Sequence, residues 1–186
     1  MGVLSVLWPL AMHRQLTDVA LYRGLLGWMM IYLGLLTLSM TRYGLQMIAN
    51  KRNHDANRHW SMVALQMVVF IAGVNCFVQG IILHQPLMIL VSVLGFGTTM
   101  TYLWYIFKAA RGPTDYIPEH LKAMVATGIA AYTAFLSVGL IAHVPQLAFN
   151  PIIWAAPSVV GMTIIIYFLR RYPKRAAPMQ ETQHAL

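Results

Sequence analysis

The sequence predicts an all-α membrane protein with five transmembrane helices, and two observations carry that prediction. Of its 186 residues, 59% are hydrophobic and only 10% are charged, whereas soluble domains carry about 25% charged residues. The chain also contains five apolar runs that each reach the roughly 20 residues a helix needs to cross a bilayer. All five must be helical, because lipid offers no partner to an open backbone amide or carbonyl group.

The five runs follow one another with short connections between them. They cover approximately residues 24–47, 60–83, 87–108, 119–142 and 151–170. Pro118 and Glu119 open the fourth run, where a proline and an acid are favourable in the first turn. We divide the chain into an apolar, interfacial lead-in at 1–18, the five-helix domain at 19–172 and a cytoplasmic basic, polar tail at 173–186.

The basic residues predict the orientation of these helices. Ten of the thirteen lysines and arginines lie in the first connection, the third connection or the tail: Lys51, Arg52, Arg58, Lys108, Arg111, Lys122, Arg170, Arg171, Lys174 and Arg175. Because cytoplasmic loops carry an excess of Lys and Arg, we expect the N-terminus outside and the C-terminus inside a bacterial cytoplasmic (inner) membrane. These loops account for the net charge of +8, so no nucleic-acid partner is expected.

A short segment occurs twice. "GIILHQP" occupies residues 80–86 and "GLIAHVP" occupies residues 139–145, so Gly, Ile, His and Pro recur 59 residues apart. The second and third helices would then form one hairpin and the fourth and fifth another, as two repeats of parallel topology beside the first helix. Convergent turn chemistry, without duplication, is the alternative explanation.

Four histidines are candidate cofactor ligands: His59, His84, His120 and His143. Their separations along two of the helices are roughly 35 Å at 1.5 Å per residue, longer than the ~30 Å hydrocarbon core. They would therefore form one layer at each interface, an arrangement similar to that of two-haem membrane cytochromes b. Haem b is one hypothesis, although these spacings are wide for ligands that lie inside a helix bundle. The simpler interpretation is that interfacial histidines satisfy helix ends and face lipid headgroups.

A transition metal is the second cofactor hypothesis. Its inner candidates are His54, Asp55, His59, Glu119 and His120, and its outer candidates are His84 and His143.

Polar residues within the spans are candidates for a ligand path. Arg42 is the charged residue inside a predicted span, where it either snorkels to the interface or faces the bundle and binds an anion. Asn75 and Gln79 are four residues apart on one helical face, so they either join helices or line a path. Thr133 is the fourth candidate. Glycines of the first and third spans predict close helix approaches: Gly24, Gly27, Gly34, Gly95 and Gly97.

The last two helices carry a pattern of spaced residues. His120 and Met124 are followed by Thr133-Ala134-Phe135, and then by Trp154, Pro157 and Gly161. This pattern, with "NRHWSM" at 57–62, resembles a group of bacterial integral-membrane proteins known only as a domain of unknown function. The resemblance covers about two thirds of the chain and implies the polytopic fold without an activity. It marks His120 and Thr133 as residues to test, whereas Gly139 and Ser158 stand where the group has Asn and Thr.

These observations favour a non-catalytic membrane protein, either an accessory subunit or a binder of a small ligand or lipid. The sequence contains no phosphate-binding loop, zinc-protease helix or nucleophile–base set, which is why we do not expect an enzyme. A haem- or metal-binding redox protein and a small oligomeric carrier are the alternatives. The expected partners are the lipid bilayer and either a larger membrane complex or further copies of this chain.

Overall fold

The computed structural model describes residues 2–7, 23–109, 112, 114–143 and 150–171, and these ranges contain helices and turns but no strand. The elements are α1 (Gly2–Leu7), a π-helical segment η1 (Arg23–Trp28), α4 (Met29–Ala49), a 3₁₀ segment η2 (His54–Arg58), α5 (Trp60–Ile82), α6 (Pro86–Phe107), α7 (Tyr116–His143) and α8 (Pro151–Arg171). The predicted all-α class is therefore confirmed.

The predicted spans that correspond to α5, α6 and α8 agree with the observed helices to within one residue at each end. The first span differs, because it begins as the π-helical turn η1 before α4 continues to Ala49. The fourth span starts earlier than expected, at Tyr116, which places Pro118 and Glu119 inside its first turn. Of the predicted lead-in only α1 is described, and the predicted tail lies outside the described residues.

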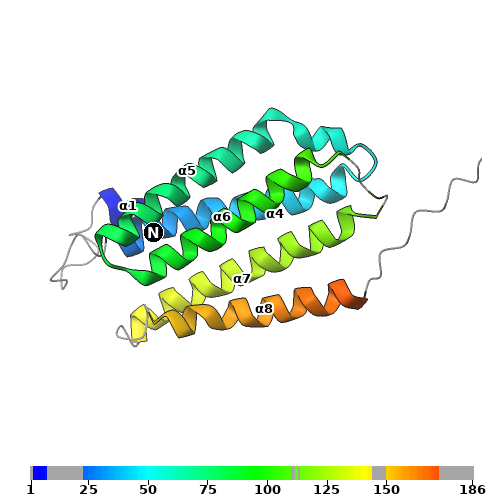
Figure 1. Cartoon of the computed structure of the whole chain (residues 1–186). Coiled ribbons are helices and arrows are strands. Elements are labelled where there is room, and N and C mark those ends of the chain that lie inside the picture. Colours follow the sequence, from blue (N-terminus) through cyan, green and yellow to red (C-terminus); the bar gives the residue numbers. More distant parts are fainter. Residues whose placement is uncertain (1, 8–22, 110–111, 113, 144–149, 172–186) are drawn as a thin grey trace, which may run out of the picture.

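The five long helices lie side by side and alternate in direction along the chain (Figure 1). α4 is the central helix: it packs against α5 on one side and most extensively against α7 on the other. α5 pairs with α6 and α7 pairs with α8, so two helical hairpins flank α4. The central position of α4 follows from its buried residues, because Tyr32, Leu36, Tyr43 and Met47 recur four or seven residues apart and so share one helix face.

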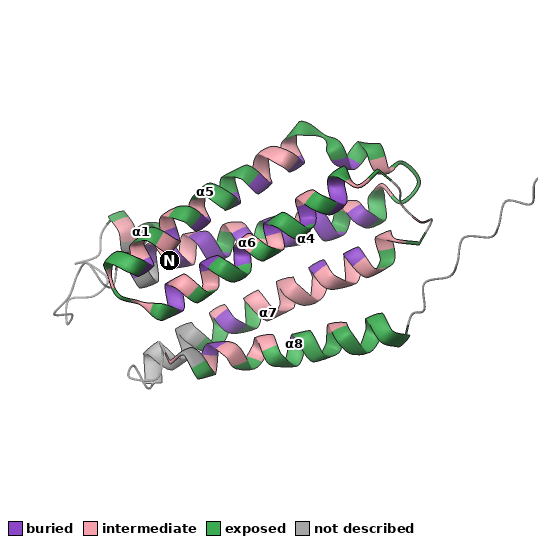
Figure 2. Cartoon of the chain, in the orientation of Figure 1, coloured by how far each residue is buried: buried purple, intermediate pink, exposed green. Residues whose placement is uncertain are grey.

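The outward surfaces of the helices are apolar. α5, α6 and Ile152–Arg171 of α8 are each long and apolar enough to cross a membrane. α8 is the most exposed of the long helices (Figure 2), and its side chains Val159, Ile166 and Phe168 face outward. Apolar surface on this scale is unfavourable in water but suits lipid, so the protein is a helical membrane protein.

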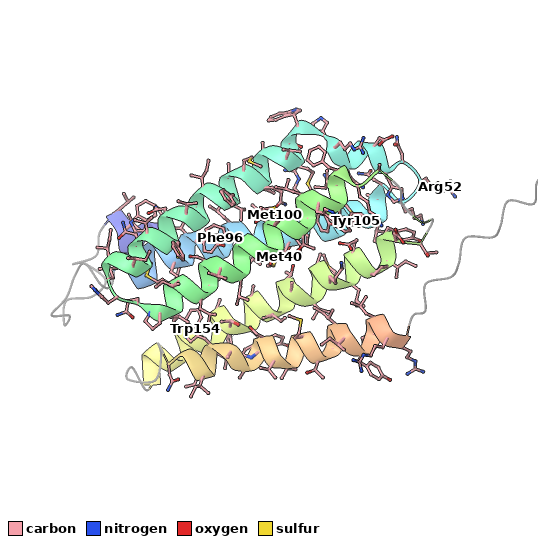
Figure 3. All side chains as sticks on the ribbon, viewed as in Figure 1. Met40, Arg52, Phe96, Met100, Tyr105 and Trp154 are labelled. Atoms are coloured by element: carbon pink, nitrogen blue, oxygen red, sulfur yellow. The ribbon has the colours of Figure 1, made fainter. Side chains whose placement is uncertain are left out.

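α8 is attached to the rest of the bundle mainly through α7. Trp154, labelled in Figure 3, is only 5% exposed, and Gly161 is also buried. These two residues are seven apart and therefore share one helical face. A Cβ atom at Gly161 would overlap the side chain of Ile129 on α7, which explains why a glycine stands at this contact.

The predicted close approaches are confirmed at three glycines and wrong at two. A Cβ atom added at Gly24 would meet Leu83, one at Gly27 would meet Val6 of α1, and one at Gly95 would meet Tyr32. Nothing lies within 4 Å of the corresponding position at Gly34 or Gly97. The two exceptions have a common cause, because both glycines are on the exposed side of their helices.

His84 has a backbone role in the turn between α5 and α6. Its φ angle is 52°, and it is the one non-glycine residue with positive φ in the described part of the chain. The backbone N–H of Gln85 donates to the Gly80 carbonyl at 2.8 Å, and that of His84 donates to the Ile81 carbonyl at 3.2 Å. This is the Schellman arrangement, in which a residue in the left-handed conformation ends a helix. Pro86 then opens α6.

The second copy of the repeated segment does not end its helix in the same way. α5 stops at Ile82, two residues before His84, whereas α7 continues as far as His143. α6 begins two residues after His84, but α8 begins only at Pro151. The pairing into two hairpins is present, and an internal duplication stays a prediction.

Candidate functional site

Most of the predicted site residues lie at one end of the bundle, which we call the basic end. This end carries η2, the connection from α6 to α7 and the last turn of α8 (Figure 1). Arg52, labelled in Figure 3, marks it. Three consecutive residues of α4, Arg42, Tyr43 and Gly44, each contact a different group here. The charged and polar side chains around them form what we call the basic-end cluster: Arg42, Tyr43, His59, Ser61, Glu119, His120 and Lys122.

Arg42 joins α4 to the start of α5. Its Nη2 donates to Ser61 Oγ at 2.8 Å, and Ser61 Oγ lies 2.9 Å from His59 Nδ1. The backbone N–H of Ser61 also donates to His59 Nδ1, at 3.3 Å, so His59 is the N-cap of α5. Because Nδ1 accepts the cap hydrogen bond, this histidine carries its proton on Nε2, and the Ser61 hydroxyl donates a hydrogen bond to Nδ1. Arg42 therefore faces a helix end rather than the lipid.

Glu119 joins α7 to α4. Only 6% of it is exposed. Its Oε2 accepts a hydrogen bond from the Tyr43 hydroxyl at 3.0 Å, and its Oε1 accepts one from Lys122. The Tyr43 ring stacks on Tyr102 of α6, with centroids 3.8 Å apart and planes inclined by 8°. The carboxylate is thus neutralised by Lys122 and held by a phenol that α6 supports.

His120 makes a second connection between α7 and α4. Its Nδ1 donates to the Gly44 carbonyl at 2.7 Å. A Cβ atom at Gly44 would overlap Met124 and would lie 3.0 Å from the Ala123 side chain, so α7 approaches α4 closely here. His120 and Met124, four residues apart, therefore pack together against Gly44.

The predicted metal ligands are not brought together. Within the described ranges, no three His, Cys, Asp or Glu residues lie close enough to hold a metal ion. Asp55 pairs instead with Arg58 at 3.6 Å, while Glu119 and His120 are used within the basic-end cluster. His54 belongs to η2, and its Nδ1 is buried without a described partner.

The four predicted cofactor histidines occupy both ends of the bundle. His59 and His120 belong to the basic end, and His84 lies at the opposite end in its turn. His143 ends α7, and its side chain lies outside the described residues. Since Nδ1 of His59 and of His120 are already bonded within the protein, only their Nε2 atoms could face a cofactor.

The predicted path residues do not form one path. Arg42 is at the basic end, whereas Thr133, on α7, donates to the Ile129 carbonyl at 2.8 Å. Asn75 and Gln79 are half-buried on α5. Neither amide makes a side-chain hydrogen bond to a residue in the described ranges, and both interpretations of this pair stay predictions.

Asn75 lines a groove between α4 and α5, which we call the α4–α5 groove. Its volume is about 310 Å³, and its walls are Trp28, Ile31, Tyr32, Leu35, Val68, Ile71, Ala72 and Asn75. Apart from the Asn75 amide and the polar atoms of the two aromatic residues, these walls are hydrocarbon. The groove thus offers apolar surface and an amide at membrane depth.

A second hollow lies on α6 near the basic end. It measures about 550 Å³ and is lined by Met100, Thr101, Leu103, Trp104, Phe107 and Lys108. Lys108 Nζ lies 5.7 Å from the centroid of the Trp104 ring and 3.3 Å from Asp115 Oδ2. Its lining residues come from α6 and from Lys108, the residue directly after this helix, and the Lys108 cation already has a carboxylate partner. The α4–α5 groove is therefore the better-formed site.

Comparison with protein-family models, with curated proteins and with solved structures finds no match to this chain. The chemistry of the site must therefore be inferred from its own residues.

Several residues of these sites were not predicted from the sequence. Ser61 links the predicted residues Arg42 and His59. Tyr43 bonds to the predicted residue Glu119, and Tyr32 and Gln66 lie in the core. The contact between Ser61 and His59 could have been predicted, since Ser61 stands two residues after this histidine at the start of a helix. Tyr43 could have been found from its spacing on the buried face of α4, together with Tyr32 and Leu36.

Proposed function

We propose that the protein crosses a bacterial cytoplasmic membrane five times, with its N-terminus outside and its C-terminus in the cytoplasm. The clustering of Lys51, Arg52, Arg58, Arg170 and Arg171 at the basic end supports this orientation. α4 and α7 contain 21 and 28 residues and would extend roughly 31 and 42 Å at 1.5 Å per residue, enough to cross the ~30 Å hydrocarbon core. Both pack within the bundle, so their polar residues face protein partners instead of lipid.

Labelling of introduced cysteines tests this orientation. In a Cys76→Ser background, Gln85→Cys is expected to react with a membrane-impermeant maleimide on intact cells. Asn53→Cys, in the loop at the basic end, is expected to react only after the cells are permeabilised. The reverse pattern, or labelling of both positions from one side, would exclude the proposed orientation.

Within this topology, we propose that the protein is a non-catalytic binder of a lipid or another membrane-soluble amphipathic molecule. The α4–α5 groove is the observation that carries this proposal, because it combines an apolar wall with the Asn75 amide. Ligand pockets are mostly apolar and contain a few polar groups that orient the ligand. An acyl chain would lie along Ile71 and Val68, and a carbonyl or hydroxyl group of the ligand would bond to the amide.

The resemblance of the last two helices to a bacterial family of unknown function stays part of this proposal. The contacts of its pattern residues support a structural role for them. His120 and Met124 pack on α4 at Gly44, and Gly161 packs on α7 at Ile129. These residues would then maintain the bundle, while ligand contacts would come from α4 and α5.

A photoactivatable phospholipid with a diazirine on its acyl chain tests the proposed binding in proteoliposomes. Peptides that contain α4 and α5 groove residues are expected to be labelled preferentially. Ile71→Trp places a large ring in the groove, so it is expected to lower that labelling several-fold.

Val74→Trp is the matched control, because Val74 is an exposed residue of the same helix that does not line the groove. It should leave the labelling of the groove unchanged. Equal labelling of all lipid-facing helices, or equal effects of the two tryptophans, would contradict the proposal.

A further inference from the structure

We propose that the interface of α4, α5 and α6 binds water at the level of Tyr32, Gln66 and Thr99. All three residues are buried, with exposed fractions of 1%, 0% and 1%. In each, one polar atom has no hydrogen-bond partner within the described ranges: Tyr32 Oη, Gln66 Oε1 and Thr99 Oγ1. They come from three different helices, α4, α5 and α6, that pack against one another. This proposal does not depend on ligand binding in the α4–α5 groove.

The Tyr32 hydroxyl reaches the seam between α5 and α6. A Cβ atom at Gly73 would lie 3.2 Å from Tyr32 Oη, and one at Gly95 would overlap the same oxygen. Gly73 on α5 and Gly95 on α6 therefore leave room for the hydroxyl end of the Tyr32 ring. Tyrosine differs from phenylalanine only by its hydroxyl group. The hydroxyl of Tyr32, and not its ring, is therefore the group that needs a hydrogen-bond partner.

Thr99 differs from the other helical threonines of the described ranges. Those at 37, 41, 98, 101, 127, 133 and 163 each donate to the carbonyl oxygen four residues earlier, at 2.7–3.0 Å. The Thr99 hydroxyl makes no such bond, although Thr98 and Thr101 of the same helix do. Its hydrogen is therefore free to be donated into the interface.

Gln66 supplies the third group. Its Nε2 donates to Ser39 Oγ at 2.8 Å, and its Oε1 has no described partner. The two ends of a glutamine amide can exchange places by a half turn. In either orientation one end bonds to Ser39 and the other points into the interface, so the need for a further partner is the same.

The helical spacing places these groups next to the buried end of the basic-end cluster. Thr99 is one turn beyond Gly95, which Tyr32 contacts, and three residues before Tyr102, which stacks on Tyr43. The rise from Gly95 to Tyr102 is about 10 Å. Tyr43 in turn donates to Glu119. The polar atoms thus form a track from the middle of the bundle towards a buried carboxylate.

Water fits this track better than an apolar filling does. A buried polar group without a partner is strongly unfavourable, and buried polar groups in native proteins are bonded to protein or to ordered water. A buried water typically makes about three hydrogen bonds. The phenol, the threonine hydroxyl and the amide offer donors and acceptors to water molecules along this track.

The direction of a stability change tests the proposal. Thr99→Val keeps the shape of the side chain and removes its hydroxyl. If Thr99 binds water, the thermal midpoint of the detergent-purified protein should fall by about 2–4 °C. If the interface is dry, the valine removes an unpartnered polar group, and a rise in the midpoint would overturn the proposal. Thr101→Val, whose hydroxyl is bonded to Gly97 on the exposed face, is the matched control and should not reproduce the fall.

Radiolytic footprinting provides a second readout on the unsubstituted protein. Hydroxyl radicals formed from bound water oxidise the side chains beside it, so Tyr32 should be oxidised despite being buried. Met88, which is fully buried on α6 away from this track, should be protected although methionine is intrinsically more reactive. Oxidation of Tyr32 no greater than that of Met88 would overturn the proposal even where Thr99→Val cannot be purified.

Discussion

Gly95→Ala is expected to destabilise the protein by about 3 kcal/mol, the upper end of the usual cost of overpacking a core. The added methyl group would overlap the Tyr32 hydroxyl and lie 2.8 Å from its Cζ atom. Tyr32 cannot easily withdraw, because it is 1% exposed and its ring is also close to Gly73. For a chain of this size the thermal midpoint in detergent should fall by roughly 6–12 °C.

Gly97→Ala is the control for this effect. Gly97 is two residues away on the same helix, and no atom lies within 4 Å of its Cβ position. Alanine there should be neutral or should stabilise the helix by up to about 1 kcal/mol. Adding Tyr32→Leu to Gly95→Ala should restore part of the lost stability by removing the end of the ring. Equal effects of the two glycine substitutions would show that the phenol does not occupy this seam.

Glu119→Ala is expected to destabilise the protein by about 2–3 kcal/mol. The substitution leaves the buried Tyr43 hydroxyl without its acceptor and Lys122 without its counter-ion. Most of the loss should come from Tyr43, because Lys122 is 31% exposed and water screens its charge. Chemical denaturation followed by tryptophan fluorescence measures the change.

Asp55→Ala is the matched control for that substitution. Asp55 also forms an ion pair, with Arg58 at 3.6 Å, but its side chain is 82% exposed. Exposed pairs contribute little, so a change of less than about 0.5 kcal/mol is expected. If Asp55→Ala and Glu119→Ala were equally disruptive, burial of the Glu119 carboxylate could not be the cause.

The existence and the boundaries of the helices were predictable because each depends on nearby residues. Pro86 at the start of α6 and Pro118 and Glu119 in the first turn of α7 are local signals. The length of each apolar run likewise follows from the chain itself. η1 was missed, since a π-helical turn has no clear pattern in the residues that form it.

The contacts of the candidate sites were less predictable because they join distant parts of the chain. Arg42 and Ser61 are 19 residues apart, and Tyr43 and Glu119 are 76 apart. Periodicity places a residue on a helix face, but it does not say which helix covers that face. Gly95 and Gly97 illustrate the limit: two residues apart, one is against Tyr32 and the other is open.

His84 shows a second limit of prediction from the sequence. A histidine in a short turn attracts interpretation as a ligand, since its ring binds metals and haem. In the structure its positive φ angle ends α5, a task of the main chain that any residue tolerant of the left-handed region can perform. The side-chain chemistry alone could not distinguish these two reasons for its presence.

The attachment of α8 has a consequence for biosynthesis. A ribosome makes the chain from its N-terminus, so α8 emerges after α4, α5, α6 and α7. The interfaces of α4 with α5, α6 and α7 require nothing from α8, so they can form before it emerges. α8 then has only to dock on α7 through the face that bears Trp154 and Gly161. The order of synthesis thus matches the order in which the interfaces can close, with the outermost helix added to a bundle whose centre is already assembled.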